Sequence, residues 1–195
     1  MRYWLESWKG MMGMKQRVAV LGAGSWGTAL AIVLADNGHD VLMWARREDQ
    51  VNEMNGHQTN EKYLSGVTLP KQLKASTHMG EVLAHGEALL ISVPTSGMRE
   101  AVREIVAFNK TIPYVIHASK GIEPDTLLRV SELMKDEGIE KVTDSIVCLS
   151  GPSHAEEVAR RQPTTVTVSS DDVHATKRLK ICLLTKTFAC IRMKI

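Results

Sequence analysis

The sequence has few cysteines and lacks any long hydrophobic run. Its 195 residues contain Cys148, Cys182 and Cys190, an odd number without metal-ligand spacing. We therefore expect neither a disulfide framework nor a metal site, and a reducing, cytoplasmic location. No apolar stretch has the length of a transmembrane span or of the core of a signal peptide, so no membrane anchor is expected.

A strong excess of charge of either sign is also lacking. The formal net charge is +2, and the chain before Lys180 has 20 basic and 22 acidic side chains, which gives −2. A body of that charge offers no electrostatic footprint for nucleic acid or for an anionic membrane surface. The length fits one ordinary domain, or one domain and the start of another.

Short apolar runs alternate with helical patterns along the chain. The predicted strands are residues 17–21, 40–45, 87–94, 114–119, 145–152 and 164–170. This alternation predicts an α/β fold with a doubly wound, mostly parallel sheet of the Rossmann type.

Helices are predicted between these strands. The first covers residues 25–38 and ends at Gly38. A second follows Pro94, a third is opened by Pro124 with Leu127 facing inward, and a short one is capped by Ser153 with Glu156. The apolar faces of the second and third consist of Met98, Val102, Ile105 and Val106, and of Leu127, Val130 and Met134.

The segment "GAGSWG" has G-x-G-x-x-G spacing between the first predicted strand and the first helix. Gly22 permits the tight turn, Gly24 lets the backbone approach a pyrophosphate, and Gly27 lets the helix and strand pack closely. The free N–H groups and dipole of the helix N-terminus favour an anion at this point. The motif predicts dinucleotide binding, against the alternative of a glycine-rich turn without a ligand.

The end of the second predicted strand bears on the choice of dinucleotide. An Asp or Glu here would favour NAD, but this chain has Arg46 and Arg47 directly after Trp44 and Ala45. A pair of guanidinium groups suits the 2′-phosphate of NADP. We therefore expect NADPH to be preferred, with NADH as the alternative cofactor. The alternative without a function is that both arginines are simply solvated surface residues.

Three further segments follow predicted strands: "SVPTSG", "ASKGIEP" and "SGPSHAEE". Ligands of open α/β sheets bind outside the carboxyl ends of the strands. Lys120 could hold a phosphate or a carbonyl oxygen, and Gly151 and Ser153 could meet a substrate oxygen. His154 fits a helix surface equally well, and "GPSHA" is not the G-x-S-x-G of a hydrolase nucleophile.

Together "GAGSWGTALA", "SVPTSGMRE", "SKGIEPDTLLRVSE" and "LSGPSHAEEVARRQPTTV" closely resemble the bacterial NAD(P)-dependent glycerol-3-phosphate dehydrogenases, from about residue 17 to 179. The resemblance implies reversible reduction of dihydroxyacetone phosphate to sn-glycerol 3-phosphate, for phospholipid synthesis in the cytoplasm. It also implies a homodimer for the full-length family member. The alternatives are a non-catalytic NADP-binding module and another Rossmann reductase of a hydroxy or keto acid.

The resemblance also implies roles for individual residues. It matches Lys120 to a contact shared by cofactor and substrate, and Gly151 and Ser153 to substrate contacts. The residues that it matches to cofactor contacts alone are Ser25, Trp26, Arg46, Arg47, Tyr63 and Ala155.

The resemblance further implies a domain division. Residues 14–179 would form the Rossmann domain, and residues 1–13 an extension from an upstream start, because Met14 leads directly into the first strand. The family continues with a helical domain that brings a proton-donating lysine, whereas residues 180–195 read as an aberrant tail. No residue of this chain is thus expected as the catalytic acid, with Lys120 as an assisting residue. We expect dinucleotide binding with negligible turnover.

A frame shift would explain this tail. Back-translation from Lys180 with freely chosen synonymous codons, read two nucleotides later, gives D-L-F and V-Y-T-N-E-D at the family's spacing. We therefore expect an insertion or deletion near the Leu179 and Lys180 codons. A genomic sequence without one would contradict this hypothesis.

Overall fold

The computed structural model describes residues 15–193, so the expected extension over residues 1–13 lies outside the described residues. Within that range one sheet has the strand order β3-β2-β1-β4-β5-β6-β7-β8. Neighbouring strands are parallel except for β6 and β7, which are antiparallel. The strands are β1 (Arg17–Leu21), β2 (Asp40–Trp44), β3 (Leu73–Ser76), β4 (Ala88–Ile91), β5 (Val115–His117), β6 (Ile146–Ser150), β7 (Thr164–Ser169) and β8 (Phe188–Arg192).

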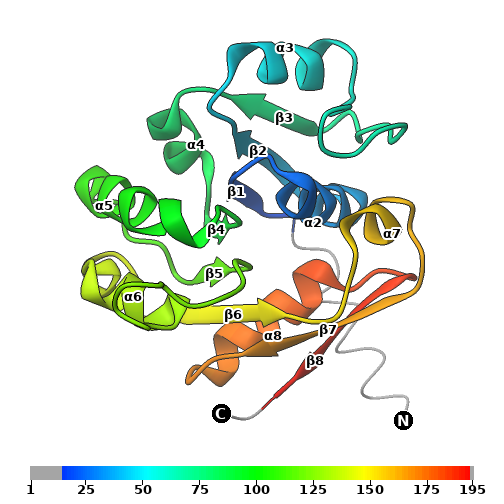
Figure 1. The fold of residues 1–195 in the computed structure, drawn as a ribbon. Helices are drawn as coiled ribbons and strands as arrows, with labels where there is room; N and C mark the ends of the chain where they lie inside the picture. Colours follow the sequence, from blue (N-terminus) through cyan, green and yellow to red (C-terminus); the bar gives the residue numbers. More distant parts are fainter. Residues whose placement is uncertain (1–14, 194–195) are drawn as a thin grey trace, which may run out of the picture.

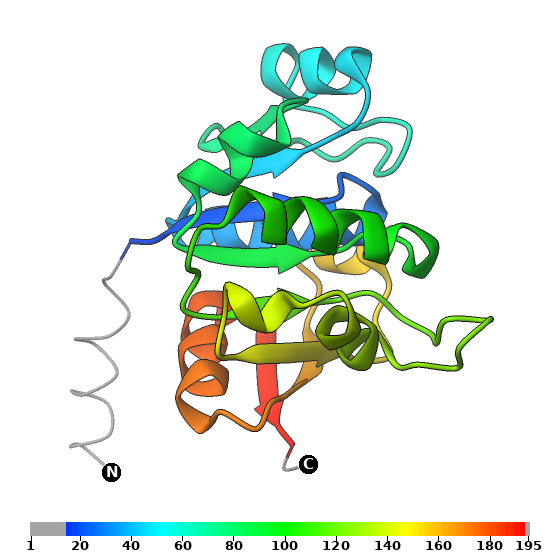
Figure 2. The ribbon, with the colours of Figure 1, turned by 90° about the vertical axis from the view of Figure 1, so that its left-hand side faces the viewer.

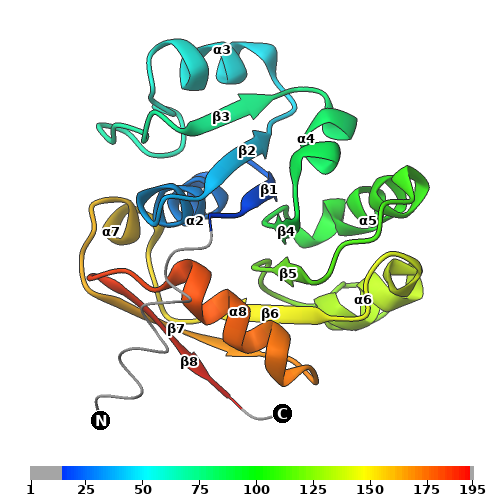
Figure 3. The ribbon, with the colours of Figure 1, turned by 180° about the vertical axis from the view of Figure 1, so that it is seen from behind.

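Helices cover both faces of the sheet. Figure 2 shows α4, α5 and α6 in front of one face, and Figures 1 and 3 place α2 and α7 on the opposite side. The α-helices are α2 (Ser25–Asp36), α3 (Glu48–Gly56), α4 (Met79–His85), α5 (Met98–Phe108), α6 (Val130–Asp136), α7 (Ala155–Ala159) and α8 (Val173–Leu183). The expected α/β fold with a doubly wound, mostly parallel sheet is confirmed.

The two faces carry separate hydrophobic cores, because successive side chains of a strand point to opposite sides of the sheet. In β1, Val18 and Val20 belong to the core under α2, α3, α7 and α8. Ala19 and Leu21 belong to the core under α4, α5 and α6. Both cores bury the central strands, which explains why these strands read as continuous apolar runs.

The central strand β1 pairs with both β2 and β4. The chain therefore leaves β1 toward one edge of the sheet and later returns to build the other half from β4 onward. Such a reversal opens a crevice at the carboxyl ends of the strands, which is where ligands bind in open α/β sheets.

Some predicted elements differ from the structure near the first half of the sheet. The run at residues 87–94 contains β4, the fourth strand rather than the third, because β3 precedes it. The strand β3 is short and lies at the edge, and its sequence "LKAS" has little apolar character. The helices α3 and α4 were not predicted either.

Two predicted helix starts are wrong. Pro124 does not open a helix, because α6 begins at Val130 and Leu127 has φ +59° and is 68% exposed. Ser153 does not cap α7, since the cap position is His154 and no side chain bonds there. In both cases the helix begins later than predicted, so the segment between the strand and the helix is longer.

The strand β7 was expected to be the last, but β8 follows it. Five residue pairs join β8 to β7 in parallel register, and Phe188 and Cys190 are buried in the core beneath α8. The described part of the tail therefore belongs to the same sheet. The fold says nothing about the reading frame, so the frame shift stays a prediction.

The histidine at the end of β5 makes stability depend on pH. His117 is 4% exposed, and burial lowers the pKa of its imidazole to about 4, with the Ser119 backbone opposing the change only in part. Below its ordinary pKa of 6.5 the unfolded chain binds a proton that the folded chain does not. Stability is therefore lost as the pH falls from 6.5 toward 4.

We predict that replacing His117 with Leu reduces this pH dependence. The free energy of unfolding of the parent should fall by about 2 kcal/mol between pH 8 and pH 5 because of His117, and this part should vanish in the variant. Urea titrations at both pH values measure it, with the exposed His57→Gln as the control. An undiminished pH dependence in His117→Leu would contradict the prediction.

Candidate functional site

A cleft of about 860 Å³ lies at the carboxyl edge of the sheet, beyond the ends of the paired strands β1 and β4. Its walls come from the glycine-rich turn after β1 and the segments after β2, β4 and β5. The residues that precede and begin α7 complete it. The predicted site residues that line it are Gly22, Gly24, Ser25, Trp26, Gly27, Arg46, Arg47, Tyr63, Lys120, Ser153 and Ala155.

Two glycines of the turn are needed for close packing. Gly22 has φ +106°, and a Cβ at this position would lie 2.5 Å from the carbonyl oxygen of Ser92. A Cβ on Gly27 would lie 2.0 Å from the carbonyl oxygen of Gly22. The turn can therefore close onto α2 and β4 only without these side chains.

Gly24 differs from its two neighbours in the motif. It precedes α2 with φ −76°, and a Cβ built on it would meet nothing within 4 Å. The space beside its backbone is thus open, and it adjoins the free N–H groups at the start of a twelve-residue helix. The pyrophosphate of a dinucleotide fits this position, where an anion can approach the backbone closely.

The arginine pair lies at the junction of β2 and α3. Arg47 directly precedes α3, and its Nε lies 3.3 Å from a carboxylate oxygen of Asp49. Both Arg46 and Arg47 are exposed and line the cleft at the end of β2. Their guanidinium groups are therefore accessible to a phosphate bound beside the ribose end of the site.

Ser25 and Tyr63 come from segments that are distant in the sequence but adjacent in space. The hydroxyl of Ser25 donates a hydrogen bond to the carbonyl of Tyr63 at 2.8 Å. Lys62 Nζ lies 5.7 Å from the centroid of the Tyr63 ring. The side chain of Ser25 thus fixes the segment that carries Tyr63 at the mouth of the cleft.

Lys120 contacts two other predicted site residues, Gly151 and Trp26. Its Nζ donates to the carbonyl of Gly151 at 3.1 Å and lies 5.8 Å from the centroid of the Trp26 ring. The hydroxyl of Thr95 donates to the carbonyl of Lys120 at 2.9 Å. Gly151 is thus in contact with Lys120 but is not one of the residues that line the cleft, and its predicted substrate contact stays a prediction.

Two polar groups of the cleft have no protein partner. The indole Nε1 of Trp26 and the hydroxyl of Ser153 are shielded from solvent, and neither has a hydrogen bond among the described residues. A buried polar group without a partner costs free energy. Both groups belong to residues that line the cleft, but the two atoms themselves are not exposed to it.

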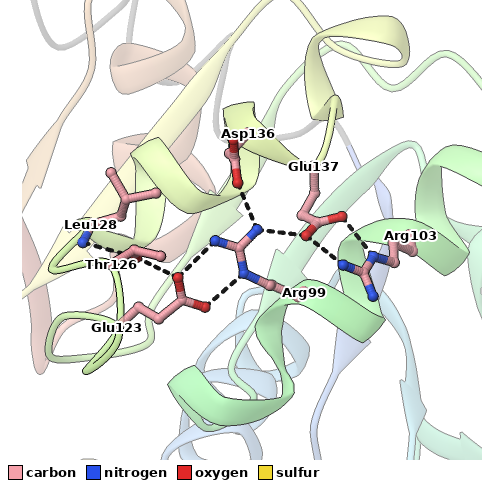
Figure 4. A network of polar contacts seen from close by, with 7 residues as sticks. All are labelled: Arg99, Arg103, Glu123, Thr126, Leu128, Asp136 and Glu137. Atoms are coloured by element: carbon pink, nitrogen blue, oxygen red, sulfur yellow. Dashed lines mark hydrogen bonds and ion pairs between the residues drawn. The ribbon is translucent and has the colours of Figure 1, made fainter.

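The segment after Lys120 is fixed by a network of ion pairs around Arg99 (Figure 4). Arg99 in α5 donates to both carboxylate oxygens of Glu123 at 2.7 Å, and also to Asp136 and Glu137 in and after α6. Arg103 donates to Glu137. The bidentate guanidinium lowers the pKa of the Glu123 carboxyl to about 2, with help from Thr126. This network holds the segment that follows Lys120 against α5 and α6.

Several residues at the cleft were not anticipated from the sequence. They include one amide on α3, hydroxyls near the ends of β4 and β5, and acidic side chains on α5 and α7. The serines among them follow strands, and this position could have indicated that they line the site. The side chains on α3 and α5 belong to no motif, so the sequence did not indicate them. The unanticipated lining residues include Gln50, Ser92, Ser96, Glu100, Glu104, Ser119 and Glu156.

Residues 15–193 contain neither a metal site nor a membrane-spanning helix. No group of three or more His, Cys, Asp or Glu side chains there could hold a metal ion. The three cysteines are free thiols, and burial raises the pKa of each. In the same part of the chain no helix is both long and apolar enough to cross a bilayer.

Comparison with known proteins agrees with this geometry. A family model described as "NAD-dependent glycerol-3-phosphate dehydrogenase N-terminus" matches residues 17–176. Glycerol-3-phosphate dehydrogenase [NAD(P)+] of Shouchella clausii is 53% identical over 175 residues, which cover 89% of this chain and 51% of the relative. The Bacillus licheniformis enzyme of that name is 50% identical over 155 residues, covering 80% and 45%.

A solved structure extends the comparison. The crystal structure of glycerol-3-phosphate dehydrogenase from Coxiella burnetii superimposes with a TM-score of 0.84 at 31% identity, covering 92% of this chain and 54% of the other. The chain spans about half the length of the curated relatives that it matches. With its glycine-rich turn, its cleft and these matches, the chain belongs to the family of NAD(P)-dependent glycerol-3-phosphate dehydrogenases and corresponds to their N-terminal region.

Proposed function

We propose that the cleft binds a nicotinamide dinucleotide with its pyrophosphate over the N-terminus of α2. The open space at Gly24, the free N–H groups of the helix and the cleft volume support this placement. We also propose a preference for NADPH, because Arg46 and Arg47 are exposed where the 2′-phosphate would lie.

For the whole protein we propose reversible reduction of dihydroxyacetone phosphate to sn-glycerol 3-phosphate. The observation that carries this proposal is the position of Lys120, which lines the cleft after β5 with its Nζ 5.8 Å from the centroid of the Trp26 ring. The Lys120 ammonium can donate to an oxygen of an anionic substrate, and it can polarise a ketone that accepts hydride. The names of the relatives agree with this substrate.

The resemblance assigns the proton donor to a lysine outside the part of the family that this chain matches. Loss of a general acid costs about 10²–10⁴-fold in rate, and loss of substrate orientation costs more. We therefore propose that residues 17–176, the part that the family model matches, bind the dinucleotide, and that proton transfer needs residues outside this part. The alternatives are a non-catalytic NADP-binding module and a reductase of another hydroxy or keto acid. The cytoplasmic location and the homodimer stay predictions.

The arginine pair gives the first test. In fluorescence titrations, the chain should bind NADPH saturably and more tightly than NADH. Replacing both Arg46 and Arg47 with Ala should weaken NADPH binding by about 10- to 100-fold, because charged hydrogen bonds to the 2′-phosphate are lost. NADH affinity should change less than about threefold.

Arg160→Ala is the matched control, since Arg160 is exposed after α7 and outside the lining of the cleft. Equal losses of NADPH and NADH affinity in the double variant would contradict a role in 2′-phosphate recognition. Absence of any dinucleotide binding to the parent chain would contradict the proposed function itself.

The glycines give the second test. Gly24→Ala should keep the free energy of unfolding within about 1 kcal/mol of the parent value, because the added Cβ meets open space. It should nevertheless weaken NADPH binding, because the added methyl group fills the place of the pyrophosphate. Gly27→Ala should lower stability by at least about 2 kcal/mol through its clash with Gly22. Urea unfolding and NADPH titration measure the pair. Unchanged NADPH binding by Gly24→Ala would show that the pyrophosphate lies elsewhere.

A further inference from the structure

A buried network of amide side chains lies beneath the glycine-rich turn, and its centre is the carbonyl oxygen of Ala23. Gln50 Nε2, from α3, donates to this oxygen at 2.7 Å. Asn60 Nδ2, from the segment after α3, donates to the same oxygen at 3.1 Å. One carbonyl thus accepts two side-chain hydrogen bonds, which uses both of its lone pairs.

The network is closed by contacts among its own members. Gln50 Nε2 lies 3.1 Å from Asn60 Oδ1, and Asn60 Nδ2 donates to the Thr28 hydroxyl at 2.9 Å. Gln50 is 5% exposed, and Asn60 and Thr28 are 0% exposed. Burial of three polar side chains is unfavourable unless they are satisfied, and a satisfied network of this kind holds its members rigidly.

The bond from Ala23 to Gly24 makes this rigidity relevant to a ligand. No peptide bond is cis among the described residues, and in a trans peptide the C=O and the following N–H point in opposite directions. The Ala23 carbonyl points inward to Gln50 and Asn60. The N–H of Gly24 must therefore point away from the network, on the outer side of the turn that lines the cleft.

The same two amides connect the other parts of the cofactor site. Gln50 lies in the first turn of α3, just after Arg47. The carbonyl of Asn60 accepts the backbone N–H of Tyr63 at 3.0 Å, so the Tyr63 segment is fixed from this side as well. The Ala23 carbonyl is thus the point where the segments bearing the arginine pair and the tyrosine meet the glycine-rich turn.

We propose that Gln50 and Asn60 are positioning residues for the dinucleotide. They hold the Ala23–Gly24 peptide in the orientation that presents the Gly24 N–H to the pyrophosphate. The proposal rests on the proposed dinucleotide binding for its ligand, but the orientation of the turn can be tested in the free chain.

The first experiment measures amide hydrogen exchange by NMR in the unliganded chain. Gln50→Met and Asn60→Asp keep the side-chain shapes but remove the donors to Ala23. Two amides of the turn report on it: Gly22, which donates to Trp44, and Thr28, which donates to Gly24. Their exchange should become at least tenfold faster, whereas the Ala118 amide, which donates to Ile91 across the sheet, should change less than twofold.

Asn55→Leu is the matched control. Asn55 is also on α3, and its side chain makes two hydrogen bonds with the backbone of Ala75 in β3, away from the glycine-rich turn. This variant should leave the Gly22 and Thr28 amides unchanged. Unchanged exchange at these amides in Gln50→Met and Asn60→Asp would overturn the proposal, as would an equal acceleration at Ala118.

The second experiment compares two ligands. NADP⁺ contains the pyrophosphate, whereas adenosine 2′-monophosphate contains only the adenosine and the 2′-phosphate. Gln50→Met and Asn60→Asp should weaken NADP⁺ binding by about 10- to 30-fold and adenosine 2′-monophosphate binding by less than threefold. Equal losses for both ligands, or no loss, would overturn the positioning role. If the parent chain binds neither ligand, the proposed function fails, and the exchange rates still decide whether the network holds the turn.

Discussion

The site depends on one close approach of backbone to backbone. The turn after β1 can enter α2 only because Gly22 and Gly27 lack side chains, and Gly22 also lies against the carbonyl of Ser92 after β4. This contact joins the two halves of the sheet at the point where they diverge. It sets the N-terminus of α2 at the carboxyl edge, and the residues after β2, β4 and β5 then surround one cleft.

Much of the fold could be predicted from the sequence, because its central strands are apolar on both faces. The strands β1, β2, β4 and β5 lie within the predicted runs, and the apolar face of α5 has the expected Met98, Val102 and Ile105. The apolar pattern does not predict elements at the edge of the sheet or residues with a left-handed backbone. The strand β3 is short and at the edge, and Leu127 has a left-handed backbone that no periodicity reveals.

The candidate site shows the same division. The glycine spacing and the order of the strands predicted where Gly24 and Arg47 would lie, and the resemblance added Trp26, which also lines the cleft. Sequence patterns could not reveal that the Lys120 ammonium donates to the carbonyl of Gly151. They also gave no sign of the amide network under Ala23, because buried hydrogen bonds between distant segments leave no local pattern.

A crystal structure of the chain with NADP⁺ bound tests the placement of the cofactor most directly. The arrangement described here predicts the pyrophosphate within hydrogen-bond distance of the backbone N–H groups at Gly24 and the start of α2, with the 2′-phosphate between Arg46 and Arg47. A dinucleotide bound in the reverse direction, or away from the glycine-rich turn, would contradict it.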